Sequence, residues 1–332
     1  MLRYLIAASL CVCSVYGADI QDTVRKSVPV AGASRLRMDA DFGSISLQAG
    51  NGQSIGVEVD FRGYPDSHGE FDRMLHDFRL DVTQQGSEVR VDGTFVHGWV
   101  PATSFVMDNL FSNNGHMICH NWRCLAYSRW LREISYRITV PKQFEAEVTT
   151  SGGGLEFEHL DGPINGRTSG GGITLVGTKG RVVVHTSGGG IRMSDVAGDV
   201  DASTSGGGIT IDGASGRVKV HTSGGGIRAS DITGEINAST SGGPVTASLL
   251  AQPKGECRFY SSGGGISLKL PGDVHVNLDA STSGGRVSTD FAVPYDDNRH
   301  HTELRTALNG GGPLVYVHTS GGGISIKRSG SL

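Results

Sequence analysis

The segment Thr186-Ser187-Gly188-Gly189-Gly190-Ile191 is one copy of a string that recurs along the chain. Copies that open with Thr-Ser-Gly-Gly follow one another every 18 residues, beginning at Thr150, Thr168, Thr186, Thr204, Thr222 and Thr240. Looser copies begin at Ser261, Thr282 and Thr319. A fixed period this short is typical of a solenoid rather than of a globular enzyme core, because each repeat buries its apolar face only against its neighbours.

The apolar residues inside one repeat indicate two short strands. Ile191 and Met193 alternate with polar residues, and Val200 and Ala202 do the same nine residues later. A glycine-rich turn precedes the first pair, and a turn around Gly198 precedes the second. The sequence therefore predicts an all-β fold, a single-chain parallel β-helix or β-solenoid with about 18 residues per coil.

The predicted outward positions carry a second pattern. One coil position alternates in charge from repeat to repeat, through Arg181, Asp199, Arg217 and Glu235. Another alternates between threonine and arginine, through Thr174, Arg192, Thr210, Arg228 and Thr246. The duplicated unit is therefore 36 residues long. Because each charge faces its opposite on the neighbouring strands, we interpret these columns as setting register and solubility rather than as a ligand site.

Composition and charge restrict the class of protein. The chain has 332 residues, a formal charge of −4, 37% hydrophobic residues and 51 glycines, and the periodicity of the glycines argues against a disordered linker. Residues 1–17 resemble a signal peptide, with Arg3 before an apolar run. No later stretch is long and apolar enough for a transmembrane segment. We therefore expect an exported protein, periplasmic, cell-surface or extracellular, and the lack of a basic run disfavours nucleic acid as a partner.

The chain divides by pattern into four parts. After the signal peptide, residues 18–147 form a β-rich N-terminal part, residues 148–328 the regular repeats and residues 329–332 a tail. Strands are expected at Leu36 and Met38 and over 42–47, 55–61, 89–95 and 134–140, with a short helix over 70–80.

An insert at 97–132 interrupts the N-terminal pattern and holds all three tryptophans, Trp99, Trp122 and Trp130. A solenoid end exposes unpaired strand edges that must be covered, so the insert is expected to be a packed cap or flap. The alternative is an aromatic contact surface, in which these three residues would bind a partner.

The cysteines allow more than one interpretation. Cys119 and Cys124 lie close together in the insert and are a candidate disulfide in an oxidising compartment. His116 and His120 give the same segment a metal-like mixture, but its spacing is not that of a standard zinc site, and unpaired thiols remain a third alternative. Cys257 is left over, either buried or free.

Three segments together resemble a known family. These are Tyr136-Arg137-Ile138-Thr139-Val140-Pro141, the repeated Thr-Ser-Gly-Gly-Gly-Ile string, and Leu308-Asn309-Gly310-Gly311-Gly312-Pro313 before the last copy at Thr319. The sequence is similar, over about residues 28–328, to the bacterial adhesin-like β-strand-repeat proteins catalogued as a domain of unknown function. The resemblance implies a β-helix-type fold in an exported or envelope protein. It implies no activity and supplies no catalytic residues, and the insert is not part of the shared pattern.

No catalytic, cofactor-binding or metal-binding residues are predicted. The glycine-rich turns precede strands, whereas a phosphate-binding loop opens a helix with Gly-Lys-Ser/Thr. The calcium-binding β-roll needs Asp two residues after a turn glycine, where this chain has Arg192 and Thr174. We therefore expect a non-enzymatic adhesin, envelope scaffold or sensing protein whose partner is an envelope component, a glycan or another protein.

The alternative function is a carbohydrate-active β-helix that binds or cleaves polysaccharide. Cleavage would require a pair of carboxylates. Asp199, Asp201 and Glu235 are predicted to be exposed, but their columns alternate with Arg and Lys, which indicates ion pairing instead.

Overall fold

The computed structural model describes residues 20–30, 32–63, 68–95, 131–293 and 302–329. The chain forms two compact units, Met1–Gly171 and Gly172–Leu332. This division follows contacts in space, whereas the sequence boundary at residue 148 follows the repeat, so the first regular strands lie in unit 1. Within the described ranges, no helix has the length and apolarity that a membrane crossing needs.

Unit 1 consists of ten strands and one helix among its described residues. These are β1 (Ile20–Pro29), β2 (Arg35–Ala40), β3 (Ser44–Gly50), β4 (Ser54–Gly63), α1 (His68–Asp77), β5 (Phe78–Gln85), β6 (Glu88–Phe95), β7 (Leu131–Pro141), β8 (Glu145–Thr150), β9 (Leu155–Glu158) and β10 (Ile164–Thr168). One sheet has the order β1-β4-β7-β3-β9 and the other the order β5-β6-β2-β8-β10. The strands predicted at Leu36 and Met38 and over 55–61, 89–95 and 134–140 are confirmed as β2, β4, β6 and β7, and the strand predicted over 42–47 is confirmed from Ser44 onward as β3. The helix expected over 70–80 begins and ends earlier than predicted, because β5 starts at Phe78, which packs in the core.

Unit 2 is built from strands alone among its described residues. They are β11 (Ile173–Val176), β12 (Val182–Thr186), β13 (Ile191–Ala197), β14 (Val200–Thr204), β15 (Ile209–Ser215), β16 (Val218–Thr222), β17 (Ile227–Ile232), β18 (Ile236–Thr240), β19 (Val245–Leu249), β20 (Cys257–Ser261), β21 (Ile266–Pro271), β22 (Val276–Thr282), β23 (Val287–Thr289), β24 (Glu303–Leu308), β25 (Leu314–Thr319) and β26 (Ile324–Ser329). We call its two sheets sheet A (β11-β13-β15-β17-β19-β21-β26-β23) and sheet B (β12-β14-β16-β18-β20-β25-β22-β24).

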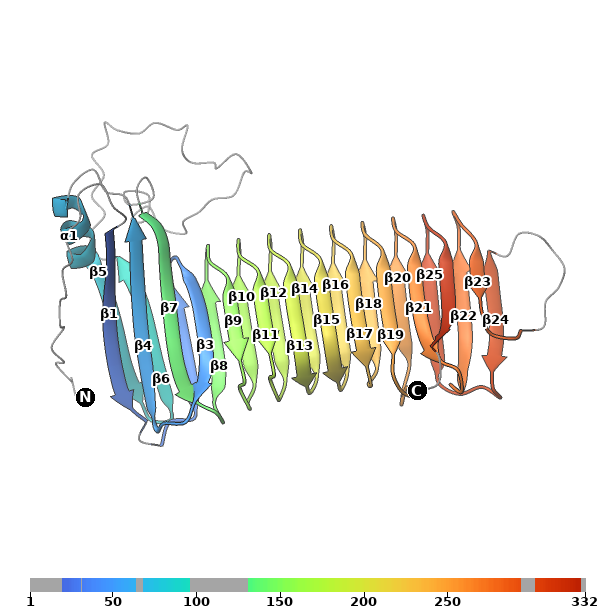
Figure 1. The fold of residues 1–332 in the computed structure, drawn as a ribbon, viewed down its shortest axis with the longest axis horizontal. Coiled ribbons are helices and arrows are strands. Elements are labelled where there is room, and N and C mark those ends of the chain that lie inside the picture. The colour runs from blue at the N-terminus through green and yellow to red at the C-terminus, as the bar shows by residue number, and fades with distance from the viewer. Residues whose placement is uncertain (1–19, 31, 64–67, 96–130, 294–301, 330–332) are drawn as a thin grey trace, which may run out of the picture. The chain divides into compact units, whose positions relative to one another are not determined.

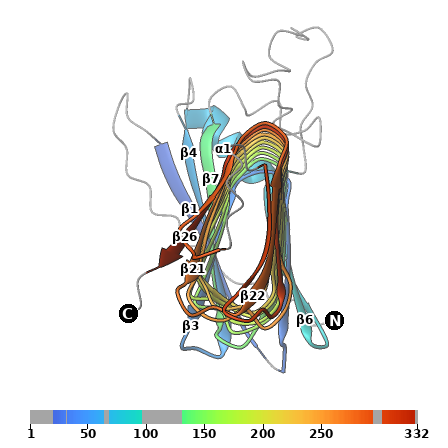
Figure 2. The same ribbon diagram turned by 90° about the vertical axis from the view of Figure 1, so that its right-hand side faces the viewer.

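The coils of unit 2 confirm the predicted parallel β-solenoid. Ile191 of β13 pairs with Ile209 of β15, and Val200 of β14 pairs with Val218 of β16, so each residue lies beside the residue 18 positions away. Each regular coil runs from sheet B through a glycine-rich corner into sheet A and returns through a second corner. The first corner reads Thr-Ser-Gly-Gly-Gly in the copies that begin at Thr186, Thr204 and Thr222. Viewed along the stack, the coils of unit 2 superpose, with the two sheets as the long sides (Figure 2).

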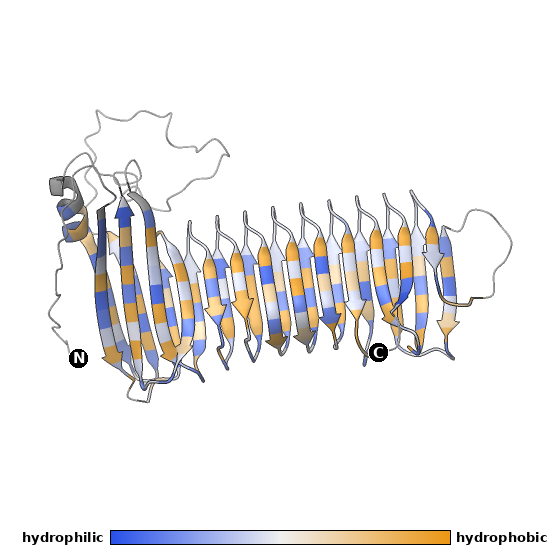
Figure 3. Ribbon diagram, viewed as in Figure 1, coloured by the Kyte–Doolittle hydropathy of each residue, from blue (hydrophilic) through white to orange (hydrophobic). Residues whose placement is uncertain are grey.

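Alternation along the strands places the core between the two sheets. Ile191, Met193, Val200 and Ala202 are buried, while the residues between them face outward. The strands of unit 2 follow one another in the stack of Figure 1, and the banding of polar and apolar residues repeats from strand to strand in Figure 3. The core of this unit therefore follows directly from the period-two pattern.

A left-handed residue explains the one irregularity in that pattern. Val196 is buried although it lies three positions after Met193 rather than two. Asp195, between them, has a φ of 53°, and Gly177, Gly213 and Asp231 adopt similar values at the same position of neighbouring coils. This turn of the backbone brings a third side chain of each coil to the inside, which is apolar in Val196, Ala214 and Ile232 and polar in Thr178.

The threonine that opens each repeat holds successive corners together. The Thr222 hydroxyl donates to the carbonyl oxygen of Gly207 in the preceding coil at 2.6 Å and accepts from the backbone nitrogen of Gly225 in its own coil at 3.3 Å. Thr204 and Thr240 make the same bond to the preceding coil. Buried threonines are thus a structural ladder, which explains why the repeat begins with Thr.

The expectation that Cys257 is left over is confirmed: it is a free, buried cysteine on β20. Burial raises the pKa of its thiol. Because the thiolate is the reactive form, we expect Cys257 of the folded protein to resist alkylation at pH 8 and to react fully in denaturant. Mass spectrometry of peptides after iodoacetamide treatment measures this. Rapid modification without denaturant would contradict it.

Candidate partner-binding surface

The residues first predicted as a partner surface, Trp99, Trp122 and Trp130, lie outside the described residues, as do Cys119 and Cys124. Their roles therefore stay predictions. The outward faces of the two units remain as places where a partner could bind.

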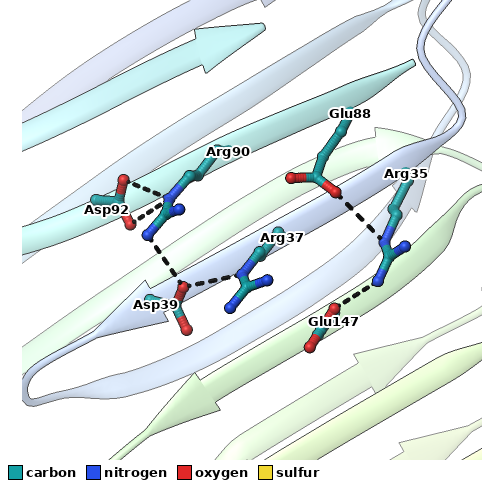
Figure 4. Close-up of polar contacts among 7 residues, drawn as sticks. All are labelled: Arg35, Arg37, Asp39, Glu88, Arg90, Asp92 and Glu147. Carbon is teal, nitrogen blue, oxygen red and sulfur yellow. Dashed lines mark hydrogen bonds and ion pairs between the residues drawn. The ribbon is translucent and has the colours of Figure 1, made fainter. Parts of the chain in front are cut away.

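The outward face of β2, β6 and β8 in unit 1 carries a network of ion pairs (Figure 4). The Nη2 atom of Arg35 lies 2.6 Å from Oε2 of Glu147, and its Nε lies 3.6 Å from Glu88. These carboxylates raise the pKa of Arg35, chiefly through the hydrogen bond to Glu147.

The same network continues along the strands. Arg90 contacts Asp92 at 2.9 Å and Asp39 at 3.7 Å, and Arg37 contacts Asp39 at 3.2 Å. Each of these charges already has a partner on its own or a neighbouring strand, so we interpret the face as fixing strand register.

Among the described residues of unit 1, one carboxylate is buried, that of Asp60. The side chain of Asp60 accepts a 2.6 Å hydrogen bond from the Thr23 hydroxyl and pairs with the guanidinium of Arg137. Its partners lie on the adjacent strands β1 and β7. This arrangement pairs a buried charge with a cation and a hydroxyl donor.

In unit 2 the predicted charge columns occur on the outward face of sheet B. Arg217 lies 3.3 Å from Glu235, and Lys219 lies 3.4 Å from Asp201. The threonine–arginine column on sheet A is likewise in register, since Thr174 pairs with Arg192 and Thr210 with Arg228. The regular part of the unit therefore has the predicted ladder.

The ladder breaks between β18 and β20. The opening Thr240 is followed by Ser261, 21 residues later instead of 18. Asn237 pairs with Arg258, which places Glu256 beside Glu235. Two like charges thus become neighbours where the pattern calls for opposite ones.

Ion pairs compensate for this repulsion. Glu256 is held by Arg258, whose Nε lies 2.9 Å from Oε1 and whose Nη2 donates to Oε2 at 3.0 Å. This pairing raises the pKa of Arg258. Together with Arg217 and Asn237, these side chains line a shallow hollow with a volume of about 250 Å³.

A stack of rings lies beside the hollow on the same face. The rings of Tyr260 and His318 are 5.5 Å apart and nearly parallel, at 17°, and Tyr316 lies 6.3 Å from His318. Ser281 contacts Nδ1 of His318 at 2.9 Å from the other side. From β12 to β18 this column holds only His and Ser, as in the pairs His185–Ser203 and His221–Ser239.

We define the break surface as Glu235, Asn237, Glu256, Arg258, Tyr260 and His318. The negative charges of its two carboxylates are balanced by the guanidinium of Arg258 and by that of the adjoining Arg217. The surface therefore offers hydrogen-bond donors, acceptors and aromatic rings with a local net charge near zero. The 21-residue spacing could have signalled it in the sequence. The neighbourhood of Tyr260 and His318 could not have been predicted, because their coils are adjacent in space but not in sequence.

A model of the family described as Toastrack DUF4097 matches residues 111–327. No curated protein matches the chain at a significant level.

Among solved structures, a candidate adhesin from Parabacteroides distasonis ATCC 8503 is 11% identical, with a TM-score of 0.40, and the match covers 93% of this chain and 97% of that one. A candidate lipid-binding protein from the same organism is 10% identical, with a TM-score of 0.42 and the same coverage. A candidate adhesin from Bacteroides fragilis NCTC 9343 is 11% identical, with a TM-score of 0.34, again covering 93% and 97%. Similarities this distant carry no argument about what this chain binds.

Proposed function

The chain belongs to the Toastrack DUF4097 family, and we propose that it is an exported, non-enzymatic, adhesin-like β-solenoid that binds a cell-envelope component through the break surface. Export rests on the signal-peptide pattern of residues 1–17, which lie outside the described residues. We propose further that this envelope component is a glycan, because of the chemistry of the break surface.

The observation that carries the proposal is the combination of a hollow and a ring stack at the one interruption of the ladder between β12 and β20. Elsewhere in that stretch several outward side chains on sheet B contact one another, as in the pairs Lys219–Asp201, His185–Ser203 and His221–Ser239. At the break, hydrogen-bond donors of Arg258 and Asn237 and acceptors of the two glutamates line the hollow. The rings of Tyr260 and His318 lie beside it. A hydroxyl-rich, uncharged partner suits such a surface better than a polyanion, because the charges cancel.

Binding by two matched variants tests this. We expect Arg258→Ala to weaken binding of the purified mature protein to intact cells or isolated envelope glycans by about tenfold, equivalent to about 1.4 kcal/mol. The control is Arg192→Ala, an exposed arginine on sheet A, which should bind as the wild type does. Equal binding by both variants, or no binding of the folded wild type to any envelope fraction, would refute the proposal.

The carbohydrate-cleaving alternative has one point in its favour, the neighbouring Glu235 and Glu256. Both carboxylates are held in ion pairs with arginines on an open face, whereas a glycosidase keeps one carboxyl protonated as an acid. We propose that the chain does not cleave glycans. Reducing-end assays on a polysaccharide panel should therefore detect no product.

A further inference from the structure

The last coil of the chain does not lie at the end of the stack. β25 pairs in parallel with β20 on one side and with β22 on the other. β26 likewise pairs with β21 and with β23. The coil formed by residues 314–329 therefore fills a slot between two coils that precede it in the sequence.

The chain leaves this slot when it passes from β21 to β22. Residues 272–275 connect the two strands and skip one rung, so β20 and β22 stand two rungs apart, about 9.6 Å at about 4.8 Å per rung. Without residues 314–329, the four strands β20, β21, β22 and β23 would each face the slot with unpaired backbone groups, which strongly favour pairing with another chain.

The inserted coil satisfies the slot on every side. Thr319 donates to the carbonyl of Gly264 at 2.6 Å, and Thr282 donates to that of Gly322 at 2.6 Å, so the threonine ladder passes through the inserted corner. Val315, Val317, Ile324 and Ile326 are buried in the core. The contacts are those of any regular coil, and an identical coil from a second molecule would make all of them.

The connection that delivers this coil is a short turn in an unusual conformation. Asn309, Gly310 and Gly311 have φ values of 49°, 93° and 83°, three consecutive residues in the left-handed region. Asn309 is tied to the skipped rung by hydrogen bonds to the carbonyls of Val274, at 2.8 Å, and Gly272, at 3.2 Å. A short, constrained turn next to an element with complete contacts of its own is the arrangement that favours exchange between identical chains.

We propose that residues 314–329 exchange between two copies of this chain, each copy filling the slot of the other. Exchange forms the same backbone bonds and the same core and opens only the turn at 309–313. The balance between monomer and dimer is then set by protein concentration against the effective concentration of the tethered coil, which is on the order of millimolar for short linkers. High protein concentration during folding favours the exchanged dimer, and reopening of a fully paired coil is slow.

Two single-cysteine variants reveal exchange directly. Tyr260 and His318 pair across β20 and β25 on the exposed face. A Tyr260→Cys chain and a His318→Cys chain, mixed, unfolded, refolded at high concentration and oxidised, should form an intermolecular disulfide between positions 260 and 318. Mass spectrometry of the linked peptides identifies this bond independently of the native cysteines.

A matched pair controls for accidental contact. His221 and Ser239 occupy the same outward column on β16 and β18, two strands that are not exchanged. The mixture of His221→Cys and Ser239→Cys chains should give at least about tenfold less linked dimer. Exchange holds positions 260 and 318 of two chains side by side at a high effective concentration, whereas positions 221 and 239 of two chains meet only by random collision. Equal yields from the two mixtures would overturn the proposal.

The variants are checked for folding by placing both cysteines in one chain. Tyr260→Cys/His318→Cys should form its bond within the monomer when refolded dilute, and no intermolecular 260–318 bond in the mixture would then overturn the proposal. If that double variant misfolds, light scattering of the wild type refolded at high concentration decides instead. A dimer that persists on dilution supports exchange, and monomer alone refutes it.

Discussion

Replacing Gly207 by alanine is expected to lower the free energy of unfolding by about 3 kcal/mol, because the new methyl group has no space. A Cβ at this position would lie 2.3 Å from the carbonyl oxygen of Gly189 and 2.4 Å from its carbonyl carbon. Both are backbone atoms of the neighbouring corner, so the clash is relieved only by separating two rungs. The thermal midpoint, followed by circular dichroism, should fall by about 10 °C.

The same corner supplies the control. A Cβ on Gly206 or on Gly208 would meet the nearest backbone oxygen at 3.0 Å, a tight contact that a small shift relieves. Alanine at either position should cost about 1 kcal/mol. If all three substitutions cost the same, the middle glycine is not required for close approach of the corners.

Replacing Thr222 by valine should cost about 2 kcal/mol, since it leaves a buried carbonyl without its hydrogen bond. Valine keeps the shape of threonine but cannot donate to the oxygen of Gly207 or accept from the nitrogen of Gly225. Urea denaturation monitored by circular dichroism measures the difference in midpoint.

Serine at the same position is the matched variant. Ser261 already occupies this coil position, where it donates to Gly243 and accepts from Gly264, each at 2.9 Å. Thr222→Ser should therefore lose less than about 1 kcal/mol, the cost of one buried methyl group. A serine variant as unstable as the valine variant would mean that the hydroxyl contributes nothing.

The regular coils were predictable because their pattern is local and repeated. Ile191, Met193, Val200 and Ala202 alternate with polar residues, and the same positions recur every 18 residues, so strand, face and register follow together. The paired columns followed from the same numbering, as Arg217 and Glu235 illustrate.

Two features depended on information that a local pattern lacks. The hydrogen bond from the opening threonine to the preceding corner was not predicted. The sequence spacing of Thr204 and Thr222 does not give the distance in space between the corners of successive coils. The insertion of residues 314–329 between β20 and β22 depends on competition among several similar coils for the same partners. Consequently Tyr260, Tyr316 and His318 could not be recognised as neighbours, and the break surface was not predicted.

The alternation of Arg181, Asp199, Arg217 and Glu235 has a consequence for how the protein can change in length. A duplication of one coil would place like charges beside each other in this column and would put Thr beside Thr or Arg beside Arg on sheet A. A duplication of two coils restores every neighbour. Insertions or deletions in the repeat array should therefore occur in steps of 36 residues. The surface columns require an even number of coils to be added or removed, although packing in the core would accept steps of 18.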